Sequence, residues 1–198
     1  MGEKVPNSFN SYERERKLFL PFIGVLAGLP LTGKSTLGEA VAAKSNVIFL
    51  DVDAVRYKDE STDSARGTEE EEKRAMETAY DQNHRIAQEM LGLDRPVLLA
   101  ATYSRESYHE QLKKLIETAR KPLVFFLLEA SDDNVRNRIE SRAASNNLSN
   151  IRTYEDYASV RDRYQKMVDA PVVTIDTDQP LEHSREAIFK TLQPYRID

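Results

Sequence analysis

The chain has 198 residues, of which 31% are charged and 40% are hydrophobic, a balance that suits one soluble domain with a sizeable core. It contains no cysteine, which excludes disulfide bonds and thiolate metal sites. No apolar run reaches the length of a membrane span, and no secretory signal pattern is present. We therefore expect a cytoplasmic protein without membrane contact. The net charge of −5 disfavours, but does not exclude, a nucleic-acid partner.

Residues 1–20 are largely polar and include the mixed-charge run 12–17. We interpret them as an N-terminal arm or short helix that packs on the edge of a sheet. Residues 21–198 contain no internal repeat and no linker, and they are predicted to form a single domain.

A glycine-rich turn is the most specific motif of the chain. The segment Gly28-Leu29-Pro30-Leu31-Thr32-Gly33-Lys34-Ser35-Thr36 matches the pattern G-x-x-x-x-G-K-[ST] at every fixed position. An apolar run, 22–27, precedes it, and apolar residues at helical spacing follow it. Backbone amides of such a turn surround a phosphate, Lys34 would contact the outer phosphates, and the Ser35 hydroxyl would bind magnesium. The motif therefore predicts a nucleoside triphosphate site.

Four more apolar runs alternate with helical patterns along the rest of the chain. The predicted strands are 47–50, 97–101, 123–128 and 172–175, and the predicted helices begin near Thr68, Tyr108, Ser131, Thr153 and Pro180. Strands that are apolar throughout and alternate with helices indicate a parallel sheet covered on both faces. The carboxyl ends of all strands then meet at one edge, where the ligand is expected.

Two carboxylates, Asp51 and Asp53, follow the second predicted strand. In extended chain both side chains point the same way, so either could work at the phosphates. We favour Asp53 as the base that accepts the proton of an attacking hydroxyl, and Asp51 as a magnesium or substrate ligand. Either carboxylate could instead cap the following turn. Arg56 could bind an anionic part of the acceptor.

Arg138 and Arg142 are four residues apart on one predicted helix, just before a polar Asn/Ser-rich stretch. Arginines placed in this way can close over a triphosphate, so we assign both to a lid at about 136–153. Surface positions are the alternative for them, as we expect for Arg136. Thr102 and Arg105, in the turn after the third strand, are candidate substrate-binding residues, because such loops build acceptor pockets.

The three histidines, His84, His109 and His183, show no spacing typical of a metal site or a catalytic triad. We expect them at the surface.

The motifs resemble those of the small P-loop kinases of the polynucleotide-kinase, zeta-toxin and chloramphenicol-phosphotransferase type. The resemblance is carried by the loop from Ala27 to Leu37, by Leu50-Asp51-x-Asp53-x-x-Arg56, by Ala101-Thr102-Tyr103 and by Arg138-Ile139-x-x-Arg142. It covers about residues 21–193 and implies a three-layer α/β fold with strand order 2-3-1-4-5. It further implies ATP- and magnesium-dependent phosphorylation of a hydroxyl, with Asp53 as base, Arg56 on the acceptor, and Arg138 and Arg142 in the lid.

The chain departs from this family at Ala100, where an aspartate often ends the third strand. Asp51, Thr102 or a water could replace that aspartate. A nucleotide-binding regulatory or interaction module with little phosphotransfer is therefore the alternative to a kinase of small-molecule or nucleotide-type acceptors. A toxin-like kinase of a nucleotide-sugar is a third possibility.

Overall fold

The computed structural model describes residues 16–59, 68–144, 151–164 and 171–197. Its centre is a five-stranded parallel sheet with the order β2-β3-β1-β4-β5. The strands are β1 (Ile23–Ala27), β2 (Ile48–Asp51), β3 (Val97–Ala100), β4 (Leu123–Glu129) and β5 (Val172–Asp176). This architecture confirms the predicted α/β class and strand order.

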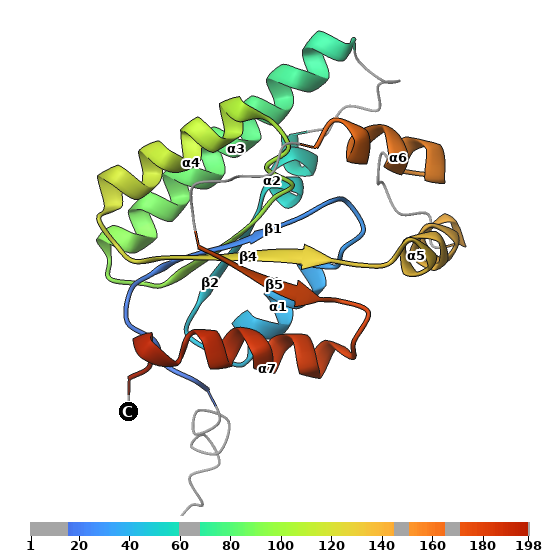
Figure 1. Cartoon of the computed structure of the whole chain (residues 1–198). Helices are drawn as coiled ribbons and strands as arrows, with labels where there is room; N and C mark the ends of the chain where they lie inside the picture. The colour runs from blue at the N-terminus through green and yellow to red at the C-terminus, as the bar shows by residue number, and fades with distance from the viewer. Residues whose placement is uncertain (1–15, 60–67, 145–150, 165–170, 198) are drawn as a thin grey trace, which may run out of the picture.

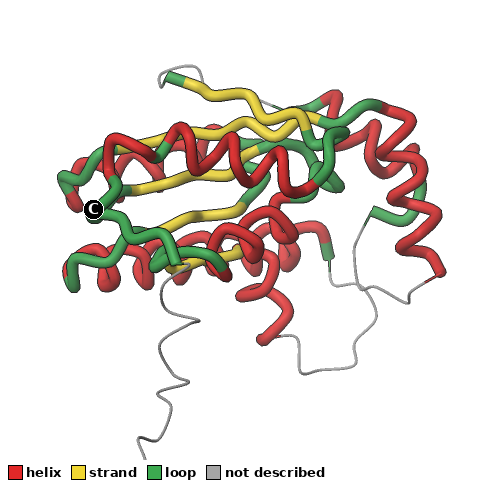
Figure 2. The backbone as a smooth tube through the Cα atoms, turned by 90° about the horizontal axis from the view of Figure 1, so that it is seen from below, coloured by secondary structure: helices red, strands yellow, loops and turns green. Residues whose placement is uncertain are grey.

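Two helices cover each face of the sheet (Figures 1 and 2). The helices α1 (Lys34–Ala43) and α7 (Leu181–Thr191) lie on one face, and α3 (Glu69–Gly92) and α4 (Glu106–Ala119) lie on the other. The helices α2 (Val52–Asp59), α5 (Asp132–Ala144) and α6 (Tyr154–Asp162) lie toward the carboxyl ends of the strands, and the short helix η3 (Gln193–Tyr195) follows α7. Among the described residues, no helix combines the length and the apolarity that crossing a bilayer requires.

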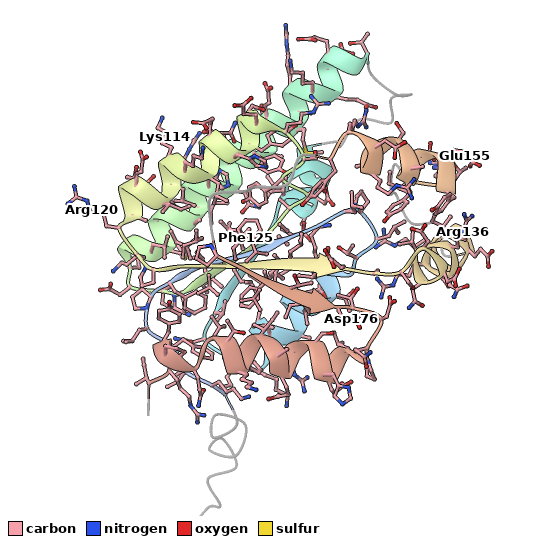
Figure 3. The ribbon with its side chains drawn as sticks, viewed as in Figure 1. Lys114, Arg120, Phe125, Arg136, Glu155 and Asp176 are labelled. Carbon is pink, nitrogen blue, oxygen red and sulfur yellow. The ribbon has the colours of Figure 1, made fainter. Side chains whose placement is uncertain are left out.

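The alternation of strand side chains divides the core in two. Val25 and Leu99 belong to the cluster under α3 and α4, whereas their neighbours Leu26 and Leu98 belong to the cluster under α1 and α7. Phe125, near the middle of β4 in Figure 3, is 3% exposed. Because both faces are covered, the inner strands β1 and β3 are apolar and buried throughout, whereas the edge strand β5 has only Ile175 buried.

Capping side chains begin several helices where the sequence predicts them. Thr68 and Glu71 form a reciprocal capping box before α3, and Thr153 and Asp156 form another before α6. Such pairs satisfy amide groups that the first helical turn leaves unbonded. The Asn134 amide likewise donates to the Ser131 hydroxyl oxygen (3.3 Å) at the start of α5.

Two of the three histidines are buried, so the surface expectation is wrong for His84 and His109, which are 7% and 9% exposed. Nε2 of His84 lies 3.0 Å from the Tyr103 hydroxyl oxygen, and Nε2 of His109 lies 2.8 Å from the Tyr103 carbonyl oxygen. These hydrogen bonds make burial possible, because each ring has a polar partner inside. His183 is exposed, as expected.

Candidate active site

The loop between β1 and α1 has the tight geometry that its sequence predicts. Gly28 and Gly33 have φ values of 143° and 84°, in the region that favours glycine. A Cβ at Gly28 would also lie 2.5 Å from the Leu128 carbonyl oxygen. Leu31 has φ 67° as well, which costs a non-glycine residue about 1–2 kcal/mol. The sequence motif did not predict this strained conformation of Leu31.

Lys34 is the first residue of α1, directly after the loop, and is 9% exposed. Its ammonium donates hydrogen bonds to the carbonyl oxygens of Gly28 (3.0 Å) and Leu29 (2.8 Å). Burial lowers the pKa of Lys34 to about 8; the nearby carboxylates of Asp53 and Asp51 act to raise it, and Arg142 acts to lower it. Three charged residues that the sequence assigns to the site, Asp51, Asp53 and Arg142, therefore lie close enough to this ammonium to change its pKa.

Asp53 does not continue the strand, contrary to the extended chain assumed for the two aspartates. β2 ends at Asp51 and α2 begins at Val52, so Asp53 lies in the first helical turn. The Asp53 amide donates a hydrogen bond to Oδ1 of Asp51 (3.0 Å). The first turn of a helix leaves amide groups without a backbone partner, and a carboxylate just before the helix can accept hydrogen bonds from them. Asp51 thus fills the capping role that the sequence left open for it.

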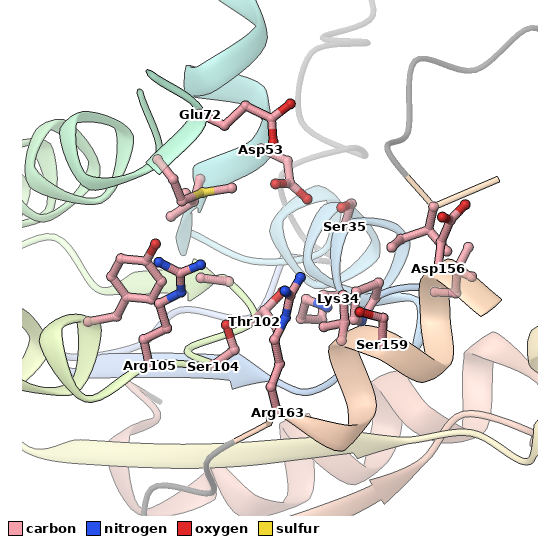
Figure 4. Close-up of a pocket in the computed structure, with 18 of the residues that line it drawn as sticks. Lys34, Ser35, Asp53, Glu72, Thr102, Ser104, Arg105, Asp156, Ser159 and Arg163 are labelled. Carbon is pink, nitrogen blue, oxygen red and sulfur yellow. The ribbon is translucent and has the colours of Figure 1, made fainter. Parts of the chain in front are cut away.

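A cleft of about 600 Å³ extends from the phosphate loop between the α3–α4 side and the α5–α6 side. Several residues proposed from the sequence line it: Pro30, Leu31, Gly33, Lys34, Ser35, Thr36, Asp53, Thr102, Arg105 and Arg142. Figure 4 shows Lys34, Ser35 and Asp53 facing this space, with Thr102 and Arg105 across from the lid side. The structure therefore brings most of the candidate residues together.

The other candidates lie elsewhere. Asp51 and Arg138 are not among the residues that line the cleft. The Arg138 guanidinium donates to the Leu31 carbonyl oxygen (2.7 Å) and to the Thr177 carbonyl oxygen (2.6 Å). It therefore ties the phosphate loop to the turn after β5. The Arg56 side chain lies outside the described residues, as do residues 145–150 of the expected lid.

Helix α6 supplies cleft residues that the sequence did not indicate. Ser159 and Arg163 line the cleft from this helix and its end, and Figure 4 shows the Arg163 side chain pointing into it. The Arg163 side chain makes no hydrogen bond or ion pair with any other described residue. The sequence contains no sign of this role, because Arg163 belongs to no motif and the pattern of α6 is defined by its apolar positions.

The α5–α6 unit is fastened to the phosphate loop by a small core, which we call the lid core: Leu31, Val135, Ile139 and Tyr157. Outside this core, the Arg136 guanidinium stacks 3.5 Å above the Tyr154 ring. The interpretation of Arg136 as an exposed residue is confirmed (Figure 3), and the stacking adds an α5–α6 contact to it.

The oxygen donors beside the loop suit magnesium. The Ser35 hydroxyl and the Asp53 carboxylate face the cleft, and Asp51 lies beside Ala100 at the same sheet edge. Magnesium prefers oxygen ligands and takes few of them from the protein, because phosphate oxygens and waters complete its shell. No cluster of three His, Asp or Glu side chains typical of a protein-only metal site occurs among the described residues. The residues present therefore fit an ion that arrives with the nucleotide.

The parallel sheet order, the glycine loop and the buried lysine together define a P-loop nucleoside-triphosphate-binding protein. The AAA domain family model (AAA_33) matches residues 23–181, and the chain belongs to this family. No curated protein sequence matches the chain significantly.

Solved structures share the fold at low sequence identity. A candidate kinase from Chloroflexus aurantiacus J-10-fl has a TM-score of 0.72 and 22% identity, with 89% of this chain and 98% of that chain covered. A gluconokinase from Sinorhizobium meliloti 1021 has a TM-score of 0.60 and 20% identity, with 89% and 93% covered. Chaetomium thermophilum Kti12 in complex with ADP-AlF3 has a TM-score of 0.61 and 18% identity, with 90% and 100% covered. The resemblance to small P-loop kinases is thus confirmed at the level of the fold.

Proposed function

We propose that this chain is an ATP- and magnesium-dependent kinase that transfers the γ-phosphoryl group to a hydroxyl of a small-molecule or nucleotide-type acceptor. One observation carries the proposal: Asp53 faces the same cleft as Lys34 and Ser35, and it is the strongest charged influence on the Lys34 pKa. A carboxylate so close to the phosphate-binding ammonium is placed to act on a nucleophile beside the last phosphate. The fold shared with a gluconokinase agrees with this chemistry.

In the proposed reaction an Asp53 carboxylate oxygen accepts the proton of the acceptor hydroxyl. The acceptor oxygen forms a bond to the γ-phosphorus, and the bond from that phosphorus to the bridging oxygen breaks to leave ADP. Lys34 and Arg142 offset the negative charge on the transferred group, and Arg163 faces the same space. Ser35, which lines the cleft, would hold magnesium, with Asp51 as the second ligand that the sequence assigns, and the ion would supply further charge neutralisation.

The test is the Asp53→Asn variant, which keeps the size of the side chain and removes its basicity. We expect transfer from labelled ATP to an acceptor panel to fall at least ~100-fold, which is the usual contribution of a general base. Nucleotide affinity, measured by calorimetry, should change less than about threefold. Unchanged transfer in Asp53→Asn would show that the base is assigned wrongly.

A regulatory or interaction module is the second candidate, and Ala100 favours it. This residue ends β3 beside Asp51 and is 1% exposed, so it brings no carboxylate to the phosphates. The lid core could then report nucleotide occupancy to a partner through α5 and α6. Tight magnesium–ATP binding without transfer to any acceptor would support the module and contradict the kinase.

A further inference from the structure

The α3–α4 side of the cleft has a chemical character of its own. Three side chains there, Met76, Tyr80 and Tyr108, line the cleft and form what we call the aromatic wall. The two tyrosine rings stack with centroids 4.0 Å apart and planes 8° apart. Because both are almost completely buried, at 2% and 4% exposure, the wall is rigid.

The Tyr80 hydroxyl of this wall is hydrogen-bonded within the protein. The Tyr80 hydroxyl oxygen accepts a hydrogen bond from the Tyr103 amide (3.0 Å), and the Tyr103 hydroxyl is paired with His84 (3.0 Å). The Tyr80 hydroxyl is therefore used inside the protein. Because both tyrosine rings are almost completely buried and Met76 is half-buried, the wall offers mainly the Met76 thioether and a little ring surface to a ligand, which favours a small apolar part of an acceptor.

The positively charged Arg105 lines the cleft together with the aromatic wall. Arg105 lines the cleft at the start of α4, and Figure 4 shows its side chain directed into the cleft beside Ser104 and across from Thr102. Its guanidinium makes no hydrogen bond or ion pair with any other residue that the structure describes. It also does not cap the helix, since the α4 start has no side-chain cap bond. A guanidinium without protein partners in a cleft is suited to binding a carboxylate or phosphate.

A polyhydroxylated sugar fits this side of the cleft poorly. Each sugar hydroxyl that faced the aromatic wall would lose its hydrogen bonds to water and gain only contact with carbon, which is unfavourable. The polar neighbours on this side are Glu72 and Lys73 of α3, and Thr102 and Ser104 next to Arg105. They lie around the aromatic wall, so hydroxyls that faced the wall itself would have no partner there.

We propose that the acceptor is a small hydroxyl compound that also carries an anionic group, bound by Arg105, and an apolar ring or chain, packed on the aromatic wall. This substrate class rests on the kinase function proposed above. The anion can be a carboxylate or a phosphate, because a guanidinium binds both in the same way.

The test measures binding separately from turnover. Three probes are titrated by calorimetry into protein saturated with magnesium and a non-hydrolysable ATP analogue: 4-(hydroxymethyl)benzoate, its uncharged counterpart 4-methylbenzyl alcohol, and gluconate as an anionic polyol. We expect the benzoate to bind at least tenfold more tightly than either of the others. A phosphate monoester counterpart, 4-(hydroxymethyl)phenyl phosphate, distinguishes the two kinds of anion by the tighter Kd.

Variants assign the preference to named residues. Arg105→Gln should weaken benzoate binding at least tenfold and alcohol binding less than twofold, and Arg105→Lys should keep part of the preference. Met76→Gln should weaken both ring-bearing probes alike. Arg95→Gln, which changes an exposed arginine between α3 and β3, is the matched control and should leave all Kd values unchanged.

Three results would overturn the substrate class: no benzoate binding, equal or tighter binding of the alcohol or gluconate, or a preference that persists in Arg105→Gln. Phosphorylation of each probe, followed by mass spectrometry with ATP, tests the kinase function itself. Arg105-dependent benzoate binding without any phosphorylation would reject the kinase and keep the anionic subsite. Gluconate phosphorylation without benzoate binding would keep the kinase and reject the substrate class.

Discussion

Arg163 and Arg161 are close in sequence but differ in what surrounds them. The Arg161 side chain contacts Asp162 (3.3 Å), the Tyr154 hydroxyl (3.2 Å) and Asp132 (3.6 Å). The Arg163 side chain lines the cleft and has no partner among the described residues. An arginine that faces a phosphate site gains strong hydrogen bonds only when the phosphates are present. Arg163 is therefore the better candidate for a ligand of the triphosphate.

We expect Arg163→Gln to raise the Kd of ATP by about tenfold, since one charged hydrogen bond contributes about 1.5–3 kcal/mol. Arg161→Gln removes the same charge from the same helix and should change this Kd less than twofold. Calorimetric titration of both variants with magnesium–ATP is the measurement. Equal effects of the two substitutions would indicate that only overall charge matters.

At the scale of elements, the phosphate loop and the lid are coupled through Leu31. Its side chain belongs to the lid core, and its carbonyl oxygen accepts from Arg138. The strained backbone at this residue, φ 67°, is therefore held by contacts of both its side chain and its carbonyl group with α5. The geometry points to Arg138 as a positioning residue, while its predicted catalytic role in the lid stays a prediction.

The two roles of Arg138 predict different kinetics. If it positions the loop, Arg138→Gln should raise the Kd values of ADP and ATP alike, by about tenfold for the loss of charged hydrogen bonds. If it contacts the transition state, turnover should fall while both Kd values stay close to those of the parent. We expect the first result. Calorimetry with each nucleotide, alongside a transfer assay, decides between them.

The packing of α3 against β3 contains a pH-sensitive group. Burial lowers the pKa of His84 from 6.5 to about 4, against a smaller upward effect of Asp81. Nδ1 of this ring is buried without a hydrogen-bond partner in the structure as described. The folded state therefore favours the neutral ring, whereas the unfolded chain binds a proton near pH 6.5.

Between these two pKa values the unfolded state holds more protons, so stability is full above pH 6.5 and falls as the pH is lowered toward 4. At pH 5 the loss attributable to His84 is about 2 kcal/mol. His84→Gln cannot be protonated, so its free energy of unfolding should fall less between pH 7 and pH 5 than that of the parent. Urea unfolding at the two pH values measures the difference, and parallel losses in both proteins would contradict the assignment.

At the scale of the whole molecule, the fold was more predictable than the lid. The inner strands β1, β3 and β4 could be read from short apolar runs, because burial on both faces demands one. The phosphate loop could be read residue by residue, because its fixed positions each serve the phosphate. The roles proposed for Arg163 and the aromatic wall could not be read from the sequence. They depend on which faces of α3, α4 and α6 are turned toward the cleft in the folded chain. The burial of His84 depends in the same way on Tyr103, 19 residues away.

The first and last described segments of the chain, 16–20 and 195–197, lie side by side. Residues 16–20, which we interpreted as part of an arm, form backbone bonds instead of a helix: the Leu20 amide donates to the Tyr195 carbonyl oxygen (2.7 Å), and the Ile197 amide to the Leu18 carbonyl oxygen (2.9 Å). Phe19 is 1% exposed and stacks on Phe189, with ring centroids 6.0 Å apart. This short segment therefore contributes to the core beneath α1 and α7.

Phe19→Ala should consequently lower the free energy of unfolding by about 3–5 kcal/mol, the usual cost of removing a buried phenylalanine ring. Leu18→Ala is the matched control, because Leu18 is 48% exposed in the same segment and surface substitutions cost about 0.5 kcal/mol or less. Denaturant unfolding of the full chain gives both values. If residues 16–20 were only an appended arm, the two substitutions would have equally small effects. A large loss of unfolding free energy confined to Phe19→Ala would show that the folding unit begins before residue 19. Contacts between the first and last described segments would then be part of the stable core.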